Sequence, residues 1–239
     1  MSDSRVRIPN ENLIGRGIYT PQEVAYYARV RTDTINRWMY GNRRGQRVLV
    51  PEVADGADRI ATFVDFVQAL AVRAIRRDHN VPLQRIRDAV DHARNRYDVR
   101  YPFAMPHRTF LFGREIVIEL DKLSLGDEPD LVQVSGRQKD QLVLHKVAEP
   151  YLTDLTFSEE EIATAYLAFE YKNRRVVMDA KKRLGQPIVA DTGYSVHAIL
   201  DAYRSEGSEE AASNVLGIEL DDVHLAIRYH DYLKGPIAA

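Results

Sequence analysis

The sequence predicts an α+β protein in which helices predominate. Three observations support this prediction: two short helices separated by a tight turn near the N-terminus, a change to period-two alternation after Tyr101, and three short amphipathic helices near the C-terminus. They divide the 239 residues into three expected domains. A winged helix-turn-helix with the following helices would occupy residues 1–100, antiparallel β hairpins and one helix residues 101–175, and a small three-helix domain residues 176–239.

Residues 18–40 contain the start and stop signals of a helix-turn-helix. Thr20 is a good N-cap, Pro21 suits the first helical position, and Glu23 can complete a capping box by accepting from the Thr20 amide. Three small or branched apolar residues follow on one face, which would let another helix approach closely. The first helix is therefore expected to begin at Pro21.

The second helix starts almost at once. Thr32 or Asp33 is its expected cap, and Gly41 is expected to end it. The apolar positions that would face inward are Ile35, Trp38 and Met39. The polar positions that would remain on the surface are Thr34, Asn36 and Arg37.

A basic turn and two longer helices follow. Residues 43–47 precede an alternating Val-Leu-Val at 48–50, which is the pattern of a wing. Residues 63–77 are apolar on nearly every side, so this helix is expected to be buried in a core or in a dimer interface. Pro82 would open a further helix with one apolar stripe over 83–97, the other candidate seam of a homodimer.

After Tyr101 the pattern predicts two antiparallel hairpins, 109–112 with 115–120 and 131–134 with 142–145, and an exposed turn over 127–130. Ser158 and Glu161 form a second capping-box pattern, which predicts a helix through Phe169. The basic segment 174–186 is expected to contain a linker or domain boundary. Three C-terminal helices should then share one small core: 195–203, 209–216 and 221–233.

Charge is distributed unevenly although the formal net charge is only −2. Residues 1–50 hold 9 basic and 4 acidic side chains, a net of +5, whereas residues 201–239 hold 3 and 8, a net of −5. The N-terminal part is thus suited to a polyanion and the C-terminal part is not. The candidate DNA-binding residues, which lie on the second helix and in the basic turn, are Thr32, Thr34, Asn36, Arg37, Arg43, Arg44 and Arg47.

The alternative interpretation of this basic patch is a solvated face in a chain that uses Arg more than Lys. The patch coincides with the start and stop signals of a helix-turn-helix, which favours DNA as its partner.

Sequence motifs give no support for a common enzyme class. The chain has no cysteine, no Gly-rich phosphate loop, no His-Glu-x-x-His and no Gly-x-Ser-x-Gly. His224 and His230 are six residues apart, so they would lie on different helix faces. We therefore expect no catalytic residue, metal or cofactor. Without a long apolar run or a secretion signal, we expect a cytoplasmic protein that does not contact the membrane.

Several stretches resemble known regulators. The opening helix-turn-helix resembles that of MerR-type regulators in Tyr19-Thr20, Glu23-Val24-Ala25, Val30, Thr34-Ile35 and Arg37-Trp38. The segments 81–87, 101–104 and 113–115 are similar to the following part of one architecture, which ends in a small helical domain entered by residues 185–193. Together these stretches resemble a VapB-type antitoxin of a type II toxin-antitoxin pair. Asp191 and Gly193 depart from the family pattern, which has Gly and often Arg there.

The resemblance implies a homo-oligomer, expected to be a homodimer, that binds operator DNA and neutralises a PIN-domain ribonuclease toxin. Because such an enzyme concentrates carboxylates around a metal, cations are the candidate toxin-binding residues: Arg174, Arg175, Lys181, Arg183 and Arg228, with Lys182 and Lys234 as further cations. Two alternatives stay open. One is a MerR-like regulator whose Tyr- and Phe-containing middle senses a small ligand, and the other is an enzyme of unrecognised class.

Overall fold

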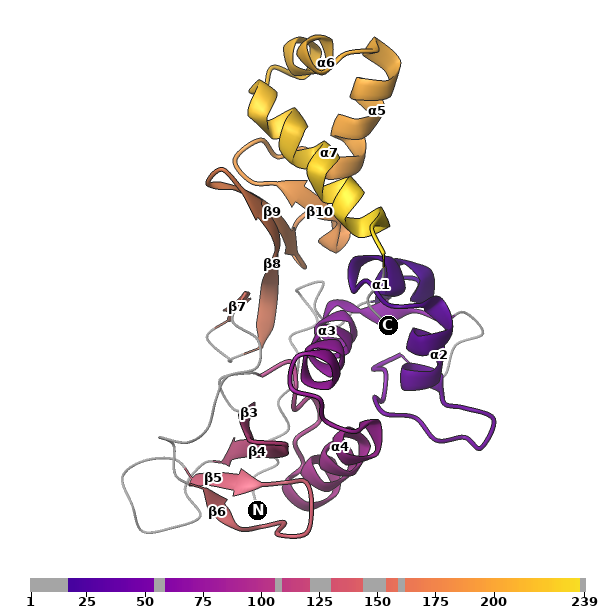
Figure 1. The fold of residues 1–239 in the computed structure, drawn as a ribbon, viewed down its shortest axis with the longest axis vertical. Helices are drawn as coiled ribbons and strands as arrows, with labels where there is room; N and C mark the ends of the chain where they lie inside the picture. Colours follow the sequence, from indigo (N-terminus) through magenta and orange to yellow (C-terminus); the bar gives the residue numbers. More distant parts are fainter. Residues whose placement is uncertain are drawn as a thin grey trace.

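The computed structural model describes residues 17–53, 59–105, 109–120, 130–143, 154–158 and 162–236. These residues form a mixed α/β fold with seven α-helices and three antiparallel sheets. Figure 1 shows the three C-terminal helices at one end of the long axis and a four-stranded sheet at the other, with the N-terminal helices between them. The expected α+β class is therefore confirmed.

The first helix follows the sequence prediction. Strand β1 (Gly17–Tyr19) leads into α1 (Pro21–Tyr27). The Oγ1 of Thr20 accepts from the Glu23 amide at 3.2 Å, and the Glu23 carboxylate accepts from the Thr20 amide at 2.8 Å. The capping box is thus present, and it fixes where α1 begins.

The second helix, α2 (Thr32–Tyr40), starts one residue earlier than expected. Arg31 is the N-cap, with no side-chain cap, so the prediction of Thr32 or Asp33 is wrong. The reason is that the Arg31 carbonyl already accepts from the amides of Thr34 and Ile35, which places Thr32 inside the helix. Gly41 ends α2, as predicted, at a φ of 94° that disfavours any residue with a Cβ.

The predicted strand over residues 48–50 is absent, so the wing lacks that strand. The amides of Val48 and Leu49 both donate to the carbonyl of Trp38, at 2.8 and 2.9 Å. These two consecutive side chains are both buried, whereas a half-exposed strand would bury alternate ones. In the described residues β1 instead pairs with β2 (Ala61–Thr62), and the basic turn remains as a loop.

Helix α3 (Phe63–Arg77) is the most enclosed element. Every residue from Phe63 to Val72 is buried, and Thr62 with Asp65 forms a capping box at its start. Burial raises the pKa of Asp65 to about 6. Because this burial occurs within one chain, α3 belongs to the core and does not supply a dimer seam. Helix α4 (Leu83–Tyr97) has the predicted buried stripe and keeps its other side exposed.

Both predicted hairpins are present in one sheet with the order β3-β4-β5-β6. Its strands are β3 (Thr109–Phe112), β4 (Glu115–Leu120), β5 (Asp130–Gln133) and β6 (Leu142–Val143). Most of the turn expected over 127–130, and the end of the second hairpin at residue 145, lie outside the described residues. The change of periodicity after Tyr101 thus correctly located this sheet.

The helix expected from Ser158 through Phe169 is wrong. A second sheet with the order β10-β9-β8-β7 contains this segment. Its strands are β7 (Leu155–Phe157), β8 (Ala163–Tyr171), β9 (Arg174–Asp179) and β10 (Pro187–Val189). Strand β8 pairs along both edges, with β7 and β9, and these long-range bonds override a local capping pattern.

The linker expected over 174–186 is likewise replaced by regular structure. β9 occupies its first part and the short turn η3 (Arg183–Gly185) its last. The expected boundary between residues 175 and 176 falls inside β9.

The three C-terminal helices form within a few residues of their predicted bounds. They are α5 (Val196–Glu206), α6 (Glu209–Leu216) and α7 (Leu220–Lys234). Their buried side chains share one core with Val176 of β9 and Val189 of β10. The C-terminal core is therefore built from helices and strands together, and no separate trihelical core forms.

One buried hydrogen bond joins β1 to the turn η3. The hydroxyl of Tyr19 donates to the carbonyl of Gly185 at 2.7 Å. Burial raises the pKa of this hydroxyl well above its usual value, so it remains a donor. A Cβ on Gly185, whose φ is +78°, would overlap the Tyr19 hydroxyl and crowd Ile18.

Gly185→Ala is expected to destabilise the protein more than Gly193→Ala. Both positions have left-handed backbone, so both variants lose about 1 kcal/mol from strain. Only at residue 185 does the new methyl meet a buried side chain, which adds about 1–3 kcal/mol. Urea unfolding of the two variants measures the difference, and equal losses would contradict the packing contact.

Candidate nucleic-acid interface

Three buried side chains, Ile35, Trp38 and Met39, set which side of α2 faces the core. Trp38 is 5% exposed and is therefore a core residue, as the sequence indicated. With this side packed inward, Arg37 lies exposed on the opposite side. The helix is thus held rigidly while it presents polar and cationic groups outward.

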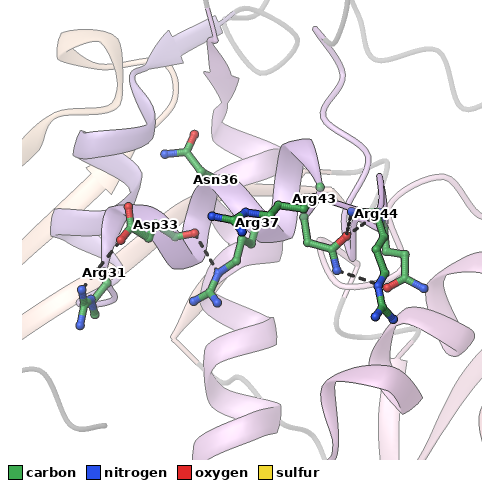
Figure 2. A pocket seen from close by; sticks show the side chains of 9 residues that line it. Arg31, Asp33, Asn36, Arg37, Arg43 and Arg44 are labelled. Atoms are coloured by element: carbon green, nitrogen blue, oxygen red, sulfur yellow. Dashed lines mark hydrogen bonds and ion pairs between the residues drawn. The ribbon is translucent and has the colours of Figure 1, made fainter.

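A first groove of about 940 Å³ runs along the exposed side of α2 and the basic turn. Figure 2 shows the side chains that line it. Four arginines lie here, Arg31, Arg37, Arg43 and Arg44, against one carboxylate, Asp33. The structure therefore brings the predicted Asn36, Arg37, Arg43 and Arg44 together, whereas Thr32, Thr34 and Arg47 lie outside this groove.

A second groove of about 670 Å³ lies between the helix-turn-helix and helices α3 and α4. The described residues that line it include apolar side chains and Thr34 but no carboxylate. The arginines that line it are Arg29, Arg31, Arg37, Arg73, Arg76, Arg77 and Arg87. Nine arginines therefore line the two grooves, because Arg31 and Arg37 belong to both.

Six of these arginines were not among the candidate DNA-binding residues: Arg29, Arg31, Arg73, Arg76, Arg77 and Arg87. The last turn of a helix favours cations through the helix dipole, so Arg76 and Arg77 have an ordinary local explanation. No sequence signal showed that α3 ends beside α2.

Three of the nine groove arginines are oriented by neutral carbonyls. Arg37 Nε donates to the Asp33 carbonyl at 3.2 Å, Arg73 Nη1 to the Ala28 carbonyl at 3.0 Å, and Arg87 Nε to the Arg47 carbonyl at 2.9 Å. Such bonds position a guanidinium without cancelling its charge. These three arginines are therefore pre-positioned for an anion, whereas Arg31 pairs with Asp33 at 3.8 Å and Arg77 with Asp78 at 2.8 Å.

Asn36 differs from the other candidates on α2. Its Nδ2 donates to the Thr32 carbonyl at 3.1 Å, and its Oδ1 accepts from Arg59 at 2.9 Å. Arg59 also stacks over Tyr40, with its Cζ 4.9 Å from the ring centroid. The Asn36 amide is thus engaged within the protein, and Arg37 is the better placed group for contacting a base.

The basic turn is fixed by Asn42. Its Oδ1 accepts from the amides of Arg44 and Gln46, at 2.9 and 3.1 Å. The side chains of Arg43, Arg44 and Arg47 are exposed. The turn therefore holds three cations outward on a closed loop.

The turn between α1 and α2 also contacts the C-terminal helix. The Cζ of Arg29 lies 4.0 Å from the ring centroid of Tyr232, and its Nη2 donates to the Pro236 carbonyl at 3.1 Å. The hydroxyl of Tyr26 is 3.3 Å from Nδ1 of His230, whose pKa burial lowers. Arg29 is therefore partly committed to α7.

The cations expected to bind a toxin do not form one cluster. Arg174 pairs with the buried Asp222 and with Glu219, at 2.9 Å, near the start of α7. Its pKa is raised by the bond to Asp222. Arg228 stacks 4.2 Å over the ring of Tyr171. These two, with Arg175, lie near the start of β9, whereas Lys181 and Arg183 follow its other end.

No metal site is evident in the described part of the chain, where no group of three or more His, Asp or Glu residues could hold an ion. His224 instead contacts Glu209 and Asp221. In the same residues, no helix is long and apolar enough to cross a bilayer. The ligand-sensing alternative rested on aromatic rings in the middle of the chain, of which Tyr151 lies outside the described residues. Two of the others are used in packing: Tyr166 contacts Phe66, and Phe169 contacts Tyr229 and Tyr232.

Comparison with known proteins gives distant relatives. No protein-family model matches the chain. It is 25% identical to a Mycobacterium tuberculosis H37Rv protein named "Putative antitoxin VapB45", over 88% of this chain and 92% of that protein. Rv2308 of the same organism, an uncharacterized protein, is 24% identical over 91% of this chain and 92% of its own length.

A solved structure shows the same fold. The crystal structure of Rv2018 from Mycobacterium tuberculosis superimposes with a TM-score of 0.59, over 88% of this chain and 97% of that one, at 20% identity. At this identity the likeness establishes the shared fold alone. The chain is thus a distant relative of a protein named as an antitoxin, with a fold already seen in a mycobacterial protein.

Arg174→Ala is expected to lower the free energy of unfolding by about 1–3 kcal/mol, because it leaves the carboxylate of Asp222 buried without its cation. Arg175→Ala is the matched control. This neighbouring side chain is exposed, so its removal should change stability by less than about 0.5 kcal/mol. Thermal and urea unfolding check both variants, and a neutral Arg174→Ala would show that the ion pair is not structural.

Proposed function

We propose that this chain is a DNA-binding antitoxin, which neutralises a PIN-domain ribonuclease by direct contact and represses its own operon. The observation that carries the proposal is the concentration of nine arginines in two grooves beside the exposed side of α2. The similarity to a protein named as an antitoxin, which spans most of both chains, supports the toxin-binding half.

On the DNA side, α2 acts as the recognition helix of a MerR-like helix-turn-helix. Arg37 reads a base edge in the major groove, with Thr34 and Thr32 beside it. Arg43, Arg44 and Arg47 contact phosphates from the basic turn, which serves as the wing without its strand. Arg76 extends the phosphate contacts along the second groove. Asn36 supports the helix through Arg59 rather than contacting DNA.

A homodimer would place two recognition helices about 34 Å apart, or a multiple of it, on an inverted repeat. Because α3 and the apolar stripe of α4 are both buried within one chain, the pairing surface lies outside the two expected seams. The contact with the toxin is made by the part of the chain that follows residue 175.

Arg37→Ala and Arg76→Ala are expected to weaken DNA binding in different ways. Arg37→Ala should cost about 1–3 kcal/mol on the DNA upstream of the chain's own gene and less on a random duplex. Arg76→Ala should weaken both duplexes alike and reduce the salt slope by about 1.

Titration at several salt concentrations measures both effects. Arg204→Ala, on the distant α5, is the control and should change neither. Equal losses from Arg37→Ala on the two duplexes would contradict its base-reading role.

The proposal requires the adjacent gene to encode a PIN-domain ribonuclease. Mixing the chain with that ribonuclease is expected to give a stable complex and to abolish RNA cleavage. Size-exclusion chromatography detects the complex, and a fluorescent RNA substrate reports cleavage. A catalytically inactive ribonuclease is the control for binding without turnover. Co-elution without inhibition, or no complex at all, would end the antitoxin proposal.

A further inference from the structure

One apolar side chain is exposed at an unusual place. Leu184 is 57% exposed in the short turn η3, directly after β9. Because more than half of this side chain is exposed, it gives up most of the burial free energy that a leucine normally contributes to a core. A leucine held in this way has the features of a contact residue for another molecule.

The backbone at this leucine is strained. Arg183, Leu184 and Gly185 have φ values of 47°, 57° and 78°, so three consecutive residues are left-handed. Gly185 is suited to this conformation, whereas a leucine is not. Glycine or asparagine would satisfy the same turn at lower cost. Strained residues of this kind are found preferentially at functional sites.

The turn is nevertheless held firmly. The amide of Gly185 donates to the Lys182 carbonyl at 2.9 Å, and that of Gln186 to the Arg183 carbonyl at 3.1 Å. The carbonyl of Gly185 accepts from the buried Tyr19 hydroxyl at 2.7 Å. Leu184 is therefore presented on a fixed support, which lowers the entropy lost when a partner binds.

The charges around Leu184 have one predominant sign. Lys181, Lys182 and Arg183 precede it, and all three are exposed. Lys182 pairs with Asp179 at 3.7 Å, and Arg183 donates to the Gly193 carbonyl, which leaves its charge uncancelled. Among the described residues the Lys181 ammonium has no ion-pair partner. The surface is thus an apolar anchor beside uncompensated cations.

We propose that Leu184 is the apolar anchor of the contact with an acidic protein partner, seated in a recess bordered by carboxylates. Lys181 and Arg183 face those carboxylates. This inference rests on the proposed function, under which the partner is the ribonuclease. A protein fits better than a nucleic acid, because phosphate backbones offer charge but no apolar recess for one leucine.

Leu184→Gly in the full chain tests the assignment. It should weaken binding of the ribonuclease from the adjacent gene at least tenfold by calorimetry, while the Tm of the unbound chain stays equal or rises. Leu184→Asn should behave alike, since asparagine tolerates left-handed backbone. Val215→Ser is the matched control: Val215 is 64% exposed on α6, and its replacement should leave the affinity unchanged. Lys181→Glu should slow association and reduce its salt dependence.

The outcomes separate the two levels of the proposal. If the wild-type chain forms no complex, the antitoxin function fails and this inference fails with it. If the wild type binds but Leu184→Gly binds within twofold, only the inference is overturned. A lower Tm for Leu184→Gly would show that the leucine serves the fold. Loss of binding to single-stranded RNA or to phosphatidylglycerol vesicles, with ribonuclease binding retained, would also overturn it.

Discussion

Burial of α3 on all sides is the constraint on which the rest of the structure depends. Because every residue from Phe63 to Val72 is covered, other elements must pack around it, including the α1–α2 pair, α4 and strand β8. The contact of Phe66 with Tyr166 links this helix to β8, and Arg73 binds the end of α1. The same packing carries the arginines at the C-terminal end of α3 to the side of α2.

The electrostatics of the grooves follow from this packing. Arginines that are far apart in the sequence converge, and Arg37, Arg73 and Arg87 are oriented by hydrogen bonds to carbonyl oxygens. The positive charge of these three is therefore retained, and like charges held close together favour the binding of an anion. A polyanion would relieve this repulsion, which is the physical reason for proposing DNA at this surface.

The C-terminal part uses its charges differently. Arg174 pairs with Asp222 and Glu219 and so holds α7 to the β8–β9 hairpin, while the guanidinium of Arg228 stacks over the ring of Tyr171. At the other end of β9, exposed cations lie beside a strained, exposed leucine. Cationic side chains near the start of β9 thus have structural roles, whereas those that follow its other end remain available for a partner.

The sequence by itself determined the elements whose signals are local. The capping box at Thr20, the apolar helix over 63–77, the first hairpin around Gly113 and the three C-terminal helices were predictable, because each depends on neighbours a few residues apart. Only the tertiary structure decided the rest. Strand β8 was mistaken for a helix, since pairing with β7 and β9 outweighs a capping pattern, and Arg76 joins Arg37 only through the packing of α3. Such contacts join residues far apart along the chain, so local pattern carries no information about them.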